Sequence, residues 1–347
     1  MNTRSVISRL VTAPGATGHE EKVGDVVLEL FSGICDDVWC DKYGDIYAKI
    51  GSGEPTVLIC AHLDEVSMIV TDILENGMLK ICSLAGVDPR VLPGSEVVVD
   101  GKVQLKGIIG AVPPHLLTGK ENAAYKIDDL TVDLGLPFEK VRELVVIGDI
   151  VRFDPIEPLE LKNGRIAGKT LDDRAHVAVM IKAIEILKKR LINCTAVFCA
   201  SVQEEKTGLG ATLSTYNVRP DIGIAIDVTH GPTPGAGEYD CFPLDKLVLT
   251  RGSNIHPKVY KMLKKAGDDI GIPTVTEAAM GHTGTDAWSM QVTAGGCATG
   301  LISTPLKYMH TNVELLDVNT LENCAKLLAQ FIANIDEDWE AQLCLDD

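Results

Sequence analysis

The chain has 347 residues, 46% of them hydrophobic, which is enough to bury the core of one large domain or two smaller ones. Its formal net charge of −17 argues against a positive surface for nucleic acid or anionic lipid, so we expect neither a nucleic-acid partner nor a membrane partner. The 10 cysteines include no CxxC pair, which indicates reduced thiols. No apolar run resembles a signal-peptide core or a membrane span, so we expect a cytoplasmic protein.

The N-terminal part of the chain shows an α/β pattern. Apolar spacing predicts helices over residues 3–12 and 19–32, followed by a half-buried strand over 45–50. The apolar run Thr56–Ala61 predicts a central strand, and it ends directly in the polar cluster His62–Glu65.

The pattern then changes to that of an all-β protein. From about residue 67 to 163 the chain shows short strand-like runs divided by glycine, proline and asparagine turns. The α/β pattern returns with a helix over 171–189, a strand over 195–202, a helix over 209–217, a strand over 221–228, and helices over 256–271 and 319–335. The sequence therefore predicts a discontinuous α/β domain (1–66 and 164–347) interrupted by a β-rich insertion (67–163).

Carboxylates and imidazoles stand where several apolar runs of the α/β part stop. They are His62, Asp64, Asp172, Asp173, Glu204, Glu205, Asp227 and His310. Each alone has an ordinary interpretation, such as a solvated side chain, a helix cap or an Asx-turn. Sites in open α/β sheets form beyond the carboxyl ends of the strands, however. Two imidazoles with three or four carboxylates suit Zn²⁺ or Co²⁺ better than the all-oxygen site of Ca²⁺.

Six motifs stand in the order found in the family forty-two metallopeptidases, the tetrahedral (TET) and glutamyl aminopeptidases. They are Ala61-His62-Leu63-Asp64-Glu65, Leu171-Asp172-Asp173-Arg174, Val202-Gln203-Glu204-Glu205, Asp227-Val228-Thr229-His230, Gly284-Thr285-Asp286-Ala287 and Tyr308-Met309-His310. The chain resembles this family over nearly its whole length. The resemblance implies an α/β/α sandwich catalytic domain with an inserted small, PDZ-like barrel that forms dimers.

The resemblance also implies a set of metal ligands. His62 and Asp227 would bind one of two divalent metal ions, Zn or Co, and Glu205 and His310 would bind the other. Asp172 would bridge both ions, and the peptide bond that follows it would be cis.

Two further carboxylates have implied roles beside the metals. Asp64 would orient the imidazole of His62 from behind, and Glu204 would be the general base that activates a metal-bridging water. Adjacent side chains of an extended strand point to opposite sides, so we expect Glu204 and Glu205 to face different partners. The implied function is a metalloaminopeptidase that removes the N-terminal residue of short peptides. The implied assembly is a homo-oligomer of dimers, which many relatives build into a tetrahedral dodecamer.

The chain departs from the family pattern at positions that are not implied ligands. Lys206-Thr207 replaces the usual Val-Gly after the glutamate pair, His176 replaces a small residue, and His282-Thr283 replaces a glycine-rich run. We expect His176 to pack or bond locally. For His230 and His282, a place in the substrate cleft and a plain loop role are both open.

Other functions remain open at the level of sequence. A related carboxypeptidase or N-acyl deacylase would use the same carboxylates, but it needs a cation for the substrate carboxylate. A glycosidase needs two carboxylates and no histidine ligand. A non-enzymatic, metal-stabilised scaffold has no need of Glu204.

Overall fold

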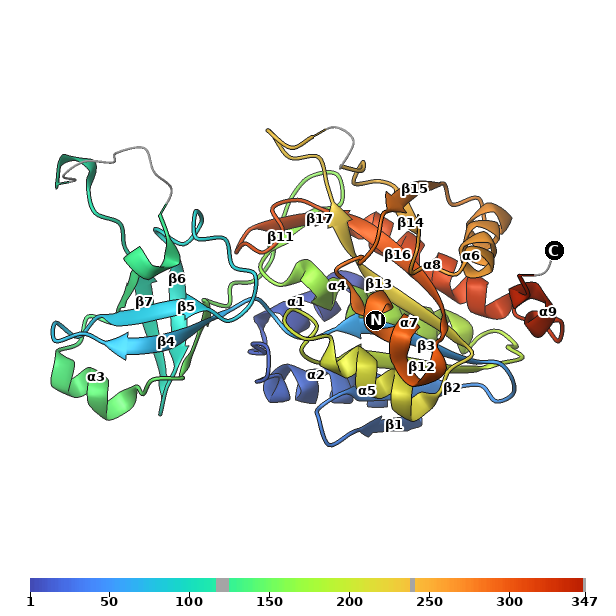
Figure 1. Ribbon diagram of the computed structural model, residues 1–347, viewed down its shortest axis with the longest axis horizontal. Coiled ribbons are helices and arrows are strands. Elements are labelled where there is room, and N and C mark those ends of the chain that lie inside the picture. The colour runs from blue at the N-terminus through green and yellow to red at the C-terminus, as the bar shows by residue number, and fades with distance from the viewer. Residues whose placement is uncertain (117–124, 238–240, 346–347) are drawn as a thin grey trace.

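The computed structural model describes residues 1–116, 125–237 and 241–345. Figure 1 shows a small β-barrel beside a larger α/β part, and the chain passes from one to the other and back. Among these residues, no helix is long and apolar enough to cross a lipid bilayer.

The larger part is built on a mixed β-sheet. In the described residues, eight strands form it in the order β1-β2-β12-β3-β13-β16-β14-β15. Their bounds are β1 (Asp37–Cys40), β2 (Ile46–Ile50), β3 (Thr56–His62), β12 (Thr195–Ser201), β13 (Ile222–His230), β14 (Leu247–Gly252), β15 (Thr274–Ala279) and β16 (Ala298–Leu306). The central strands β12, β3, β13 and β16 run parallel, so their carboxyl ends meet at one edge of the sheet.

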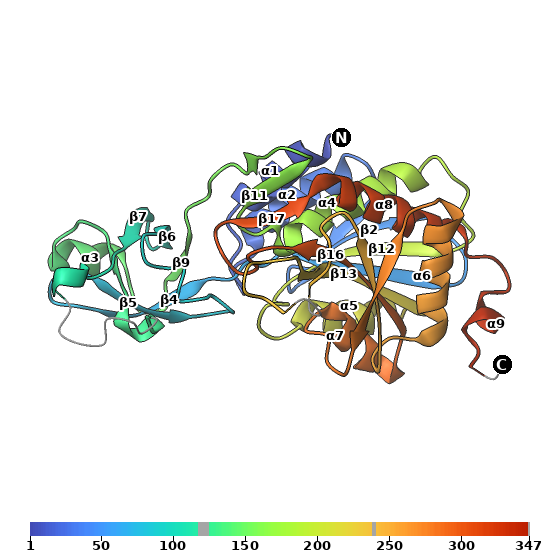
Figure 2. The ribbon, with the colours of Figure 1, turned by 90° about the horizontal axis from the view of Figure 1, so that it is seen from above.

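Helices cover both faces of this sheet (Figure 2). One face carries α1 (Thr3–Thr12), α2 (Glu21–Ser32), α4 (Leu171–Leu187), α6 (Pro257–Asp269) and α8 (Val318–Ala333). The opposite face carries α5 (Leu209–Val218) and α7 (Asp286–Val292), and the short helix α9 (Trp339–Leu343) follows α8. Local sequence sets two of the starts, because the side chains of Asn2 and Asp317 cap α1 and α8.

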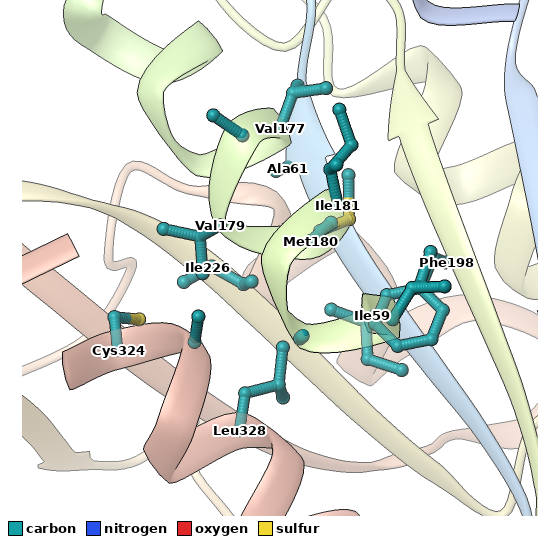
Figure 3. Close-up of a cluster of buried hydrophobic side chains, with 14 of the residues drawn as sticks. Ile59, Ala61, Val177, Val179, Met180, Ile181, Phe198, Ile226, Cys324 and Leu328 are labelled. Carbon is teal, nitrogen blue, oxygen red and sulfur yellow. The ribbon is translucent and has the colours of Figure 1, made fainter. Parts of the chain in front are cut away.

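Helix α4 lies at the centre of the main hydrophobic core. Figure 3 shows its side chains Val179 and Met180 clustered with Ile59 and Phe198 of the central strands and with Leu328 of α8. A helix that is apolar on nearly all sides is expected in such a buried place. The burial holds the first turn of α4 firmly, and that turn carries two of the predicted site residues.

The inserted part is a closed barrel in the order β4-β5-β8-β7-β6-β9. Its strands are β4 (Met68–Ile73), β5 (Leu79–Ser83), β6 (Glu96–Asp100), β7 (Gln104–Ile109), β8 (Thr131–Asp133) and β9 (Ile150–Phe153), with α3 (Phe138–Leu144) and two short 3-10 turns, Pro114–Leu116 and Ile127–Asp129. The barrel has its own core, which includes Val70, Val97 and Val132. A small sheet of β10 (Leu159–Glu160), β11 (Arg165–Gly168) and β17 (Glu314–Asp317) follows it.

The predicted fold class, an α/β domain interrupted by a small all-β barrel, is confirmed. The domain limits at 66/67 and 163/164 remain predictions. The glutamate pair differs from its predicted setting, because β12 ends at Ser201 and Gln203 turns the chain with φ 57°. Glu204 and Glu205 therefore lie in a turn, stabilised by bonds from the Thr207 and Gly208 amides to the Gln203 carbonyl, and not on an extended strand.

Candidate active site

A cavity of about 440 Å³ opens at the carboxyl edge of the central strands. His62 ends β3, Glu204 and Glu205 follow β12, Asp227 lies near the end of β13, and His310 follows β16. These residues, together with Asp172 at the start of α4, line the cavity. The structure thus brings all five predicted metal ligands and the predicted general base to one place. The Asp172–Asp173 peptide bond is cis, as the resemblance implied.

Asp172 lies between the two histidines. Its Oδ1 is 3.2 Å from Nε2 of His62, and its Oδ2 is 3.5 Å from Nε2 of His310. Nε2 of His62 is also 3.7 Å from a Glu204 oxygen, whereas Nε2 of His310 is 3.4 Å from a Glu205 oxygen. Adjacent glutamates thus approach different histidines, as expected, although a turn and not a strand separates their side chains.

The orientation of His310 depends on the barrel. Its Nδ1 donates to the carbonyl oxygen of Gly86, in the loop between β5 and β6, at 2.9 Å. This bond places the proton on Nδ1 and leaves Nε2 free to bind a cation. The inserted part therefore supplies a contact on which the site in the α/β part depends.

Replacing Gly86 by alanine is expected to weaken this site. The new Cβ would lie 2.7 Å from Nδ1 of His310, too close for the ring to keep its place. Loss of such an outer contact typically costs about 10- to 100-fold in metal affinity. Metal titration of the variant measures this. Gly110→Ala in the same barrel meets no atom within 4 Å and is the control. Equal affinity in both variants would contradict the proposed role of the contact.

The buried carboxylate of Asp64 connects His62 with the turn that carries Glu204 and Glu205. Its two oxygens accept from the Thr17 hydroxyl (2.8 Å) and from the amides of Glu204 (2.9 Å) and Glu205 (3.2 Å). Nδ1 of His62 lies 3.3 Å from its Oδ1 and has no better-aligned partner. Burial alone would raise the pKa of Asp64, but His62 and these donors outweigh it and lower the pKa. An ionised Asp64 thus orients His62 and holds the glutamate turn.

The charge balance of the cavity fits bound cations. Burial and neighbouring carboxylates raise the pKa of Asp227 and Glu204 well above the usual range, and they raise the pKa of Glu205 to about 7. No lysine or arginine is found among the described residues that line the cavity. A divalent cation would relieve this repulsion, and imidazole nitrogen with carboxylate oxygen suits a borderline metal.

Two groups of side chains offer ligand atoms within 4.8 Å of one another. One is His62, Asp172 and Glu205, and the other is His62, Asp173 and Asp227. The second group includes Asp173, whose oxygens already accept from the His62 amide and contact Nδ1 of His176. We therefore regard Asp173 as a support and keep Asp227 as the ligand.

Sequence reasoning missed three groups that hold the site. Glu314 accepts from the amides of Asp172 (3.1 Å) and His310 (2.9 Å). Glu20 accepts from the amides of Gly18 (2.7 Å) and Gln203 (3.1 Å). The third is the Gly86 carbonyl. None of them belongs to a motif, and backbone acceptors leave no signal in residue type.

Glu20 gives a pH-dependent prediction. Burial and the charge of Asp64 raise the pKa of Glu20 to about 7. The folded state thus favours the protonated form, and the stability that this proton contributes is lost as the pH rises from about 4.5 to 7. Glu20→Gln keeps an oxygen acceptor without the charge. In metal-free protein, its stability relative to the native chain should therefore increase by about 1–3 kcal/mol between pH 4.5 and pH 8.

Urea unfolding at both pH values measures this gain. Glu21→Gln changes the neighbouring, exposed glutamate and should show no such trend. A gain that is equal at the two pH values would show that Glu20 does not titrate in this range.

The departures from the family pattern, together with His230, lie in three different settings. His176 is fully buried, and its Nε2 is 2.9 Å from the Thr304 hydroxyl, so it bonds locally as expected. Lys206 and Thr207 are exposed in the turn after Glu205. His230 and His282 line the cavity, which decides their open placement in favour of the cleft.

A buried ion network lies behind the site. Arg174, two residues after Asp172, donates to the carbonyl oxygens of Leu10, Ala13, Gly15 and Leu63 and to the carboxylate of Glu65. Glu65 also pairs with Lys169 and accepts from the Gly15 amide. Burial would raise the pKa of Glu65, but Lys169 and Arg174 outweigh it and lower the pKa. The network ties α1 and the loop after it to the end of β3.

Comparison with known proteins identifies the class. The lysyl aminopeptidase of Pyrococcus furiosus is 32% identical over 329 residues, 93% of this chain and 94% of that protein. The structure of an aminopeptidase from Desulfurococcus kamchatkensis is similar with a TM-score of 0.91 at 30% identity, covering 99% of both chains. The TET1 peptidase of Pyrococcus horikoshii has a TM-score of 0.85 at 27% identity, covering 96% of this chain and 100% of that one. The chain is thus similar over nearly its whole length to peptide hydrolases of the aminopeptidase class.

The family follows from a family model. The model of the M42 glutamyl aminopeptidases matches residues 44–327, and the chain belongs to this family. The resemblance drawn from the six motifs is therefore confirmed.

Proposed function

We propose that this protein is a dinuclear metalloaminopeptidase that removes the N-terminal residue from short peptides. The observation that carries the proposal is the cluster around Asp172, with a histidine facing each of its oxygens. His62 and Asp227 would hold one cation, Glu205 and His310 the second, and Asp172 would contact both. Zn²⁺ or Co²⁺ fits this mixture of nitrogen and oxygen ligands.

The reaction assigns different tasks to the residues of the cavity. Bound cations would supply polarisation of the scissile carbonyl and acidification of the attacking water. Glu204 takes a proton from that water and later donates it to the leaving amine. Asp64 fixes the positions of Glu204 and His62 relative to each other, because it accepts from the Glu204 amide and contacts Nδ1 of His62.

The acidic wall favours an exopeptidase that acts at the N-terminus. The free α-ammonium group of a peptide substrate can pair with the carboxylates that line this cavity. A substrate carboxylate finds no lysine or arginine among the described lining residues. This absence disfavours the carboxypeptidase and N-acyl deacylase alternatives, and the two histidines disfavour a glycosidase.

A panel of aminoacyl reporter substrates tests the proposal. The protein is stripped with a chelator and assayed again after addition of Zn²⁺, Co²⁺ or Mn²⁺. We expect activity to disappear on stripping and to return with metal, and we expect an N-acetylated peptide to be refused. Cleavage of the acetylated peptide, or full activity without metal, would contradict the proposal.

We further propose that the protein forms dimers that assemble into a larger shell, most simply a tetrahedral dodecamer. One relative, the TET1 peptidase of Pyrococcus horikoshii, has been solved as a dodecamer and can assemble into a tetrahedron or a large octahedral shell. The barrel here exposes more than half of each of the apolar side chains Val103, Ile108, Val146 and Ile147. Exposed apolar groups of this kind mark contact surfaces. A monomer by light scattering in metal-replete buffer would contradict this assembly.

A further inference from the structure

Besides the proposed base Glu204, one carboxylate in the cavity wall belongs to neither group of possible metal ligands. It is Glu277 on β15, the strand at the edge of the sheet. Its Oε1 accepts from the Thr229 hydroxyl at 2.9 Å, and its Oε2 accepts from the Thr250 hydroxyl at 2.8 Å. Both donors are neutral, so the hydrogen bonds orient the carboxylate without balancing its charge.

The sheet topology explains how Glu277 reaches the cavity. Strand β14 pairs with β15 along its length but with β16 only at Val248 and Leu249. Beyond Leu249 its pairing with β16 stops, and the Glu277 side chain contacts Thr250 of β14 and Thr229 of β13 there. Both threonines are buried, so they fix the carboxylate against the wall.

No lysine or arginine lines the described part of the wall around Glu277. The lining histidines His62 and His310 contact Asp172 and the glutamate pair instead. Nδ1 of His282 accepts a hydrogen bond from the Gly284 amide. Each oxygen of Glu277 accepts one hydrogen bond from a threonine hydroxyl. A carboxylate oxygen can accept a second hydrogen bond, which a substrate group can donate.

We propose that Glu277 selects a cationic N-terminal side chain, that of lysine or arginine, an inference that rests on the aminopeptidase function proposed above. The ammonium or guanidinium group would form a charge-assisted hydrogen bond with the oriented carboxylate. The wall also offers the apolar groups of Val228, Leu301 and Met309, and the methylene stem of a long cationic side chain packs on apolar surface. An acidic side chain would meet only repulsion from Glu277.

A comparison of lysine with norleucine isolates this interaction, because the two side chains share the same stem and only lysine carries the charge. Lysyl, norleucyl and leucyl reporters are assayed with the metal-loaded enzyme and with Glu277→Gln. We expect kcat/KM for lysine relative to norleucine to fall about 10- to 100-fold in the variant, the range for one hydrogen bond to a charged group. Norleucine cleavage should hardly change, which also shows that the variant folds.

Glu337→Gln removes the same charge from an exposed position and should leave the ratio unchanged. Thr250→Val removes one of the two donors that orient Glu277, and we expect a smaller fall in the ratio. The inference is overturned if the enzyme cleaves the norleucyl and leucyl reporters but Glu277→Gln does not lower kcat/KM for lysine relative to norleucine. If no aminoacyl substrate is cleaved with any metal, the proposed function itself fails.

Discussion

Glu204→Gln is expected to lower kcat by about 10²–10⁴, the usual contribution of a general base, while both metals stay bound. Glutamine keeps the size of the side chain, and the Glu204 amide keeps its bond to Asp64. The variant therefore loses the basic oxygen and little else. Turnover of an aminoacyl reporter and metal content of the same dialysed sample measure the two quantities together.

Glu205→Gln should show the opposite behaviour. The Glu205 carboxylate is 3.4 Å from His310 and belongs to a group of possible ligands, so its loss should weaken one metal site. Excess metal should then restore part of the activity. If Glu204→Gln loses a metal while Glu205→Gln keeps both and only turns over slowly, the two roles are exchanged. If neither variant changes turnover, the active site lies elsewhere.

Arg174→Met is expected to destabilise the protein by about 3–5 kcal/mol, because the buried Glu65 carboxylate loses one of its two cationic partners and buried carbonyl oxygens lose a charged donor. Arg174 is fully buried and donates to four carbonyl oxygens besides Glu65. The variant keeps an apolar stem but removes the guanidinium donor from those oxygens, of which Leu10 and Gly15 retain a backbone donor. Arg174→Lys keeps the charge but loses the planar fork, so it should recover only part of the loss.

Urea unfolding of the variants measures the change in free energy. Arg9→Met removes an exposed arginine that pairs with Glu29 on the surface, and such pairs contribute about 0–1 kcal/mol. It is the control for the loss of one positive charge. If Arg174→Met unfolds at the same urea concentration as Arg9→Met, the network contributes no net stability.

The central strands β3, β12 and β13 and the candidate ligands near their ends were predictable from the sequence. Strands such as Thr56–His62 are continuous apolar runs because both faces of the sheet are covered by helices. A polar residue directly after such a run is conspicuous, which is how His62 and Glu205 were found. Their grouping then followed from the rule that parallel strands present their carboxyl ends at one edge.

The side of the sheet from β16 to the edge strand β15 gave a weaker signal. Strand β15 is half-exposed and contains threonine, glutamate and alanine around a single Val275, and β16 follows two glycines and contains Pro305. Neither pattern distinguishes a strand from a loop, so both strands were missed. Glu277 was missed with them, since its position depends on where β14 separates from β16.

The contact between Gly86 and His310 has a consequence for protein synthesis. The proposed ligands are spread from position 62 to position 310, and the last of them is oriented by a carbonyl that the ribosome produced more than two hundred residues earlier. A nascent chain that ends before His310 lacks this ligand. With the proposed ligand set, we expect a growing polypeptide to acquire activity only after translation has passed this point and Gly86 can contact His310.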